Sequence, residues 1–169
     1  KDDYTTQINQ KDYKAFVKKT PILATWDDHD YGYNDSGADF FNKIQSQQQH
    51  LDFFKIPENS PRRKQEGIYN SKIFKTKKGT IKVIVLDTRY FRTALTKSNK
   101  TSKKRYIPNT YGEGTVLGKK QWSWLTNELY NSKADFNIIV SSIQFLSSEH
   151  GYETWGNFPH KVDKLKKIK

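Results

Sequence analysis

Three apolar runs constrain the fold of this chain more than any other feature, because each is followed directly by polar side chains. They occupy residues 21–26, the second half of a hairpin at 68–87, and residues 136–145. Segments with helical spacing separate the runs, so the order of elements predicts an α/β fold. Ligands of layered α/β proteins bind at the carboxyl ends of strands. We therefore expect the polar residues after the three runs to converge on one cleft.

Apolar periodicity predicts three helices, at residues 4–19, 38–55 and 117–132. The first should stop before Pro21, and the second should bury Phe40, Ile44, Leu51 and Phe54. The hairpin is expected to turn at Lys78 and Gly79 and to end its second strand at Asp87. Polar stretches predict loops at 57–67, 93–116 and 150–159. With neither an internal repeat nor a linker, residues 1–169 are predicted to form part of one domain.

The formal net charge is +12, and the positive charge is spread along the chain, with its densest patches in "TKSNKTSKKR" (96–105) and "KVDKLKKIK" (161–169). Such stretches are typical of solvated loops or tails, although they leave nucleic acid and anionic substrates open as partners. The sequence has no cysteine, which excludes disulfides, zinc-thiolate sites and thiol catalysis. No run approaches the roughly 20 apolar residues of a membrane span, and the first twenty residues are too polar for a secretory signal.

Against this basic background, "LATWDDHDYGYND" (23–35), the acidic segment, gathers Asp27, Asp28, Asp30 and Asp35 around His29. Neighbouring carboxylates repel one another unless a cation or protons neutralise them. Oxygen ligands suit calcium, magnesium or manganese, and an imidazole adds iron or zinc. An EF-hand does not fit, because its invariant glycine would fall on Tyr33. A helix cap, a plain turn at Gly32 and a buried histidine are the structural alternatives.

"VIVLDTRYFR" (83–92) places Asp87 at a strand end with Arg89 two positions later. Side chains two apart in an extended chain share a face, so the two are expected to pair. The pair is either a structural salt bridge or a means of holding an arginine that grips a phosphate.

"SSEHGYETWGNFP" (147–159) carries Glu149, His150, Glu153 and Trp155 between glycines, after a predicted buried strand. This pattern favours a site loop over an idle exposed one. Ser141 and Ser142 lack the glycine elbow of a serine hydrolase, which excludes that class.

Read together, "PILATWDDHDYGYND", "VIVLDTRYFR", "LGKKQWSWL" and "GYETWGNFP" resemble, in matching order, the central part of PhoD-like phosphatases, the alkaline phosphatase D family of metallophosphoesterases. The resemblance runs from about residue 12 to about residue 165. It implies part of a four-layer α/β/β/α sandwich. It also implies hydrolysis of phosphate monoesters or diesters with iron and calcium or other divalent metals, usually in the periplasm or outside the cell.

By the same resemblance, Asp27 and Asp28 occupy the metal-ligand box, with Asn34 a further ligand. His29 takes the place of the histidine that hydrogen-bonds the phosphate and helps to protonate the leaving oxygen.

Arg89 matches the arginine of the family's Leu-Asp-Thr-Arg strand, and Asp87 is its orienting partner. Glu153 stands where the family commonly has an aspartate before Ser-Trp, so it would be a longer metal ligand.

Two family boxes, an earlier Gly-Asp and a later Gly-Asp-x-His, do not occur here, so the resemblance implies a piece of a catalytic domain, truncated at both ends. The predicted function is metal-dependent hydrolysis of a phosphate ester, with calcium or iron, or else manganese or magnesium. The substrate is a small molecule or a nucleic-acid or phospholipid diester, with no stable nucleic-acid partner. The alternatives are a non-enzymatic calcium-dependent module that binds polyanions and a plain nucleic-acid binder.

Overall fold

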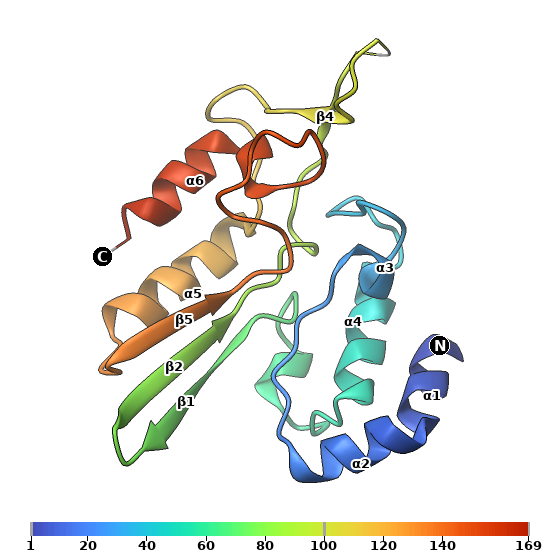
Figure 1. The fold of residues 1–169 in the computed structure, drawn as a ribbon, viewed down its shortest axis with the longest axis vertical. Coiled ribbons are helices and arrows are strands. Elements are labelled where there is room, and N and C mark those ends of the chain that lie inside the picture. The colour runs from blue at the N-terminus through green and yellow to red at the C-terminus, as the bar shows by residue number, and fades with distance from the viewer. Residues whose placement is uncertain (1, 100, 169) are drawn as a thin grey trace.

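The computed structural model describes residues 2–99 and 101–168 and confirms a mixed α/β fold. Its main sheet contains β1 (Asn70–Thr76), β2 (Gly79–Val85) and β5 (Phe136–Val140), in the order β1-β2-β5. The β1–β2 pair is antiparallel and the β2–β5 pair is parallel. Figure 1 shows this sheet beside α5 and α6, with the helices of the N-terminal third grouped at its other side.

The predicted hairpin is confirmed, with a shift of one residue in its turn. Thr76 pairs with Gly79, so Lys77 and Lys78 form the two-residue turn. The β2 strand ends at Val85, two residues before the expected Asp87.

The third apolar run forms a shorter and more exposed strand than predicted. β5 ends at Val140, and Phe136 and Ile138 are 68% and 48% exposed. Within the described residues β5 pairs only with β2, so its other edge faces outward. The expectation of a buried strand over 136–145 is therefore wrong. Hydrophobicity indicates that a segment tends to be buried, but it does not indicate which other segment would bury it.

The core beneath the sheet forms where α5 (Gly118–Tyr130) and α6 (Pro159–Lys166) pack on it. Ile84 and Leu86 from the β2 side meet Trp122 and Leu125 of α5, and all four are at least 96% buried. The helix predicted at 117–132 is confirmed within two residues. The prediction of a loop or tail at 161–169 is wrong, because α6 covers most of this segment. Val162 and Leu165 pack against the core, so the segment forms an amphipathic helix.

The N-terminal third contains four short helices. The predicted helix 4–19 is split into α1 (Asp2–Asn9) and α2 (Lys11–Lys19) by Gln10, whose ψ of 132° is extended. The single turn α3 (Asp28–Tyr31) follows, and then α4 (Lys43–Phe53).

The helix α4 begins five residues later than predicted, because turns occupy 38–42. Leu51 is fully buried, as expected, in a second core cluster with Trp26, Tyr31, Ile68 and Tyr90. Ile44 is 68% exposed, so its predicted place in the core is wrong.

The predicted loops contain small regular elements. The excursion at 93–116 carries the two-residue strands β3 (Thr96–Lys97) and β4 (Tyr106–Ile107), which pair antiparallel. Single 3₁₀ turns form at η1 (Pro61–Arg63) and η2 (Trp155–Asn157). No helix in the described part of the chain is both long and apolar enough to cross a membrane.

Candidate active site

The segment before the acidic cluster is held by side chains and not by a strand ladder. Residues 21–26 form no strand, which corrects the prediction. Instead the Thr25 hydroxyl donates to the Leu86 carbonyl at 2.7 Å, and the Trp26 indole N–H donates to Asp87 at 2.9 Å. These two bonds hold Asp27 beside the carboxyl end of β2. The sequence predicts the same place for Asp27, but at the end of a strand formed by residues 21–26.

Asp87 is the buried anchor of this arrangement. Its carboxylate is fully buried and accepts the Trp26 indole N–H and the backbone N–H groups of Ile68, Arg89 and Tyr90, at 2.9 to 3.0 Å. Burial raises the pKa of Asp87, and the four donors oppose that rise by stabilising the carboxylate. The expected side-chain pair with Arg89 does not form, because Asp87 holds the backbone of Arg89 and leaves its guanidinium free to turn elsewhere.

The Arg89 guanidinium joins two segments that are distant in sequence. Its Nε lies 3.0 Å from Asp27 Oδ1, its Nη2 also contacts Asp27, and its Nη1 lies 2.6 Å from Glu153 Oε2. The Arg89 side chain is 1% exposed, whereas that of Asp27 is 50% exposed. Burial lowers the pKa of Arg89, but the charges of Glu153 and Asp27 reverse this, so the guanidinium is firmly charged.

Glu153 has a second arginine partner. Its Oε1 lies 2.8 Å from Arg92 Nε, and the side chains of Glu153 and Arg92 are 6% and 1% exposed. Burial raises the pKa of Glu153, and the two arginines oppose the rise. A buried carboxylate between two guanidinium groups is costly to leave unpaired, so this arrangement fixes the loop before η2 against the end of β2.

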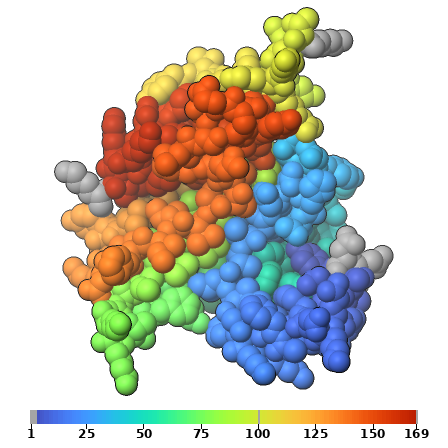
Figure 2. All heavy atoms as spheres, viewed as in Figure 1, coloured from blue at the N-terminus to red at the C-terminus, as the bar shows by residue number. Residues whose placement is uncertain are grey.

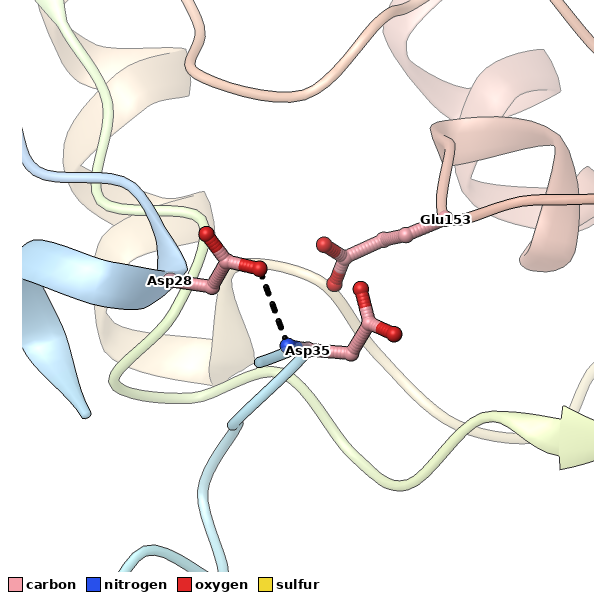
Figure 3. Close-up of side chains that lie close together, drawn as sticks. All are labelled: Asp28, Asp35 and Glu153. Carbon is pink, nitrogen blue, oxygen red and sulfur yellow. Dashed lines mark hydrogen bonds between the residues drawn. The ribbon is translucent and has the colours of Figure 1, made fainter. Parts of the chain in front are cut away.

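Three carboxylates meet beside these ion pairs (Figure 3). Oxygen atoms of Asp28, Asp35 and Glu153 all lie within 4.8 Å of one another. Figure 3 shows Asp28 on α3, Asp35 on the loop that follows it, and Glu153 entering from the C-terminal part of the chain. Hard divalent cations prefer such convergent oxygen ligands, so the three residues have the chemistry of a metal site.

Local hydrogen bonds hold the first two carboxylates in place. Asp28 accepts the backbone N–H groups of His29 at 2.9 Å and of Asp35 at 3.0 Å. Partial burial alone would raise the pKa of Asp28, but these bonds and the charge of Arg89 outweigh it and lower the pKa below its usual value. Asp35 has a positive φ of 56°, which aspartate tolerates better than most residues, and this turn points its N–H at Asp28.

These side chains line a hollow of about 550 Å³, here called the carboxylate hollow. Besides the acidic residues and Arg89, its wall includes Ser142, Gln144, His150 and Tyr152. Figure 2 shows the N-terminal and C-terminal parts of the chain abutting along one face, consistent with the ion pairs of Arg89. Residues from after all three apolar runs thus converge, as the sequence predicts.

Three of the predicted site residues do not line the carboxylate hollow: Asp87 lies buried behind it, and Asn34 and His29 lie outside it. Asn34 is exposed, and its amide nitrogen donates to Asp35 at 2.7 Å. His29 is exposed and lines a neighbouring hollow. Successive residues of a helix are rotated by about 100°, so the single turn of α3 directs Asp28 and His29 into different spaces.

Two charged residues of the candidate site, Asp35 and Arg92, are not among the predicted site residues. Asp35 belongs to the acidic segment, so its place in the sequence was a signal, but the turn that directs its carboxylate toward Asp28 was not visible. Arg92 follows Arg89 by three positions and has no sequence signal for its pairing with Glu153.

Comparison with known proteins gives a family and a fold. The family model for PhoD-like phosphatases matches residues 1–164. A solved structure described as the structure of PhoD resembles this chain with a TM-score of 0.61 and 22% sequence identity. The likeness covers 83% of this chain but 30% of that chain, and at this identity it shows the fold alone. No curated protein sequence matches.

Proposed function

Because this chain belongs to the PhoD-like phosphatase family, we propose that the protein hydrolyses phosphate esters at the carboxylate hollow with the help of bound metal ions. The observation that carries the proposal is the convergence of Asp28, Asp35 and Glu153 oxygen atoms within 4.8 Å, beside the buried charge of Arg89. The chain spans about 30% of the length of the PhoD structure it resembles, so the activity is proposed for the whole protein.

The donor set suits a hard cation. Asp28 and Asp35 present carboxylate oxygens in the wall of the hollow, and the lowered pKa of Asp28 keeps it ionised. Glu153 is shared between the cluster and two arginines, so it is the weaker ligand of the three. Calcium, iron, manganese and magnesium accept such oxygen donors. When bound, such an ion lowers the pKa of a coordinated water and polarises phosphoryl oxygens.

The protein's own residues would bind and orient the ester. Arg89 places a permanent positive charge at the wall of the hollow, where it stabilises the negative charge of a phosphoryl group although its donors are already paired. Asp27 and Asp87 hold that charge in position, the first through the guanidinium and the second through the Arg89 backbone N–H.

His29 is proposed to protonate the leaving oxygen. Its ring makes no hydrogen bond with another described residue, so both nitrogen atoms are available to a substrate. Asn34 is proposed to become a metal ligand through its amide oxygen, because its amide nitrogen is already used by Asp35.

The test is replacement of Asp28 in the full-length protein. Asp28→Asn keeps the shape of the side chain and removes its charge. We expect it to lower kcat/KM for 4-nitrophenyl phosphate by at least about 100-fold and to reduce the bound metal measured by mass spectrometry. Asp12→Asn, at an exposed position of α2, is the matched control and should match the parent.

Full activity in Asp28→Asn, or after exhaustive chelation of the parent, would refute the proposal. Calcium-dependent retention on heparin without turnover of any ester would favour the polyanion-binding alternative. Retention that falls steeply with salt and ignores metal would indicate a nucleic-acid binder.

A further inference from the structure

A second hollow, of about 820 Å³, adjoins α3. We call it the aromatic hollow, because ring-bearing residues dominate its wall, among them Tyr13, Trp26, Tyr31, Phe40, His50 and Phe54. Its volume lies within the range of sites that bind small organic molecules. Tyr33 and Phe41, which also line it, are 68% and 82% exposed, so the hollow opens to solvent.

His50 is a polar group in this wall that the fold leaves without a hydrogen bond. It is 2% exposed, and its ring packs against Trp26 at 5.2 Å and Phe54 at 4.8 Å between centroids. Neither ring nitrogen bonds to another residue within 2–99 or 101–168. Neither nitrogen is among the fully buried unpaired atoms of the described residues, so both remain accessible from the hollow and can bond to a group that enters it.

The protonation state of His50 defines what that partner can be. Burial lowers the pKa of His50 to about 3, and the nearby charge of Arg62 contributes. The imidazole is therefore neutral at physiological pH, with one nitrogen that donates and one that accepts. A neutral, planar group with a polar edge matches it, and stacking on the surrounding rings favours an aromatic one.

The two hollows adjoin across one helical turn. Asp28 lines the carboxylate hollow, and the next residue, His29, lines the aromatic hollow. An ester that lies across α3, with its phosphoryl group beside Asp28, would extend its leaving group toward His29 and the aromatic hollow.

We propose that the aromatic hollow binds the leaving group of the ester, and that this group carries a planar aromatic ring whose polar edge bonds to His50. The inference rests on the proposed function and specifies its substrate class. An aryl phosphate and a nucleoside phosphate share this chemistry.

Filling the hollow separates aromatic from aliphatic esters. Ser46 lines the aromatic hollow on α4, whereas its neighbour Gln45 is exposed and does not line it. In the full-length protein we expect Ser46→Trp to lower kcat/KM for 4-nitrophenyl phosphate or a nucleoside 5′-monophosphate by about 10-fold or more. Glycerol phosphate should be hydrolysed as by the parent. Gln45→Trp should leave all three rates unchanged, and whichever aromatic ester responds identifies the source of the ring.

Equal effects of Ser46→Trp on the aromatic esters and on glycerol phosphate, or no effect on any, would overturn the inference. If the parent hydrolyses no ester, the proposed function fails, and direct binding then decides this inference separately. Equilibrium dialysis with 4-nitrophenol should show binding to the parent and to Gln45→Trp but not to Ser46→Trp, and ¹⁵N shifts of the His50 ring should change on binding. Absence of 4-nitrophenol binding to the parent would refute it.

Discussion

The two hollows beside α3 are held open by opposite kinds of interaction. The wall of the carboxylate hollow is fixed by charge, through Arg89 with Asp27 and through Glu153 with both buried arginines. The wall of the aromatic hollow is fixed by ring packing, and its buried His50 is neutral. This difference in wall chemistry means that the single turn of α3 separates a region suited to a phosphoryl group from a region suited to an uncharged ring.

The largest expected effect tests the charged wall. Arg89→Ala leaves Glu153 buried with one partner and Asp27 with none of its guanidinium contacts. We expect the free energy of unfolding to fall by about 3–5 kcal/mol, measured by urea denaturation.

Arg105→Ala is the control for this variant. Arg105 is 52% exposed and lies 3.3 Å from Asp35, so its removal should cost only about 0–1 kcal/mol. Equal losses of unfolding free energy in Arg89→Ala and Arg105→Ala would show that a buried arginine contributes no more to stability here than an exposed one.

The next effect tests the neutral wall through pH. The unfolded chain protonates His50 near pH 6.5, whereas the folded chain does so only near pH 3. The unfolded state therefore binds more protons between these values, and stability present above pH 6.5 is lost as the pH falls. The loss should reach roughly 3 kcal/mol by pH 4.

His50→Phe keeps a ring in the wall and removes the titrating group. Its urea midpoint should depend less on pH between 6.5 and 4 than that of the parent. Parallel pH profiles for the two proteins would mean that the fold does not lower the pKa of His50.

The smallest effect concerns Trp26, which connects the aromatic hollow to Asp87 behind the carboxylate hollow. Trp26 lines the aromatic hollow and also donates its indole N–H to Asp87 behind the carboxylate hollow. Trp26→Phe should destabilise the fold by about 1–3 kcal/mol more than Trp122→Phe. The reason is that Trp26→Phe removes the indole N–H that donates to the buried carboxylate of Asp87, whereas Trp122→Phe removes no hydrogen bond. Trp122 is the matched control, because it is buried but its indole N–H has no partner among the described residues. Thermal unfolding of the two variants measures the difference, and identical melting temperatures would contradict it.

Local patterns predicted much of the fold. The hairpin at 68–87 and the helix at 117–132 followed from alternation and helical spacing, which depend on near neighbours in sequence. Residues 21–26 were predicted as a strand because they are apolar and extended, but their hydrogen bonds go through the side chains of Thr25 and Trp26. The helix at 159–166 was missed because its lysines hid the packing of Val162 and Leu165.

By itself, the sequence determined the α/β class, the acidic segment and the placing of polar residues after the apolar runs, because each depends on residue type and short-range spacing. Only the tertiary structure decided that Arg89 binds Asp27 and Glu153, that Asp35 joins Asp28, and that His29 lines a different hollow. These pairings join segments up to 64 residues apart or depend on the rotation of a helical turn. Which partner a charge finds is set by the folded geometry, since every arginine carries the same charge wherever it stands in the sequence.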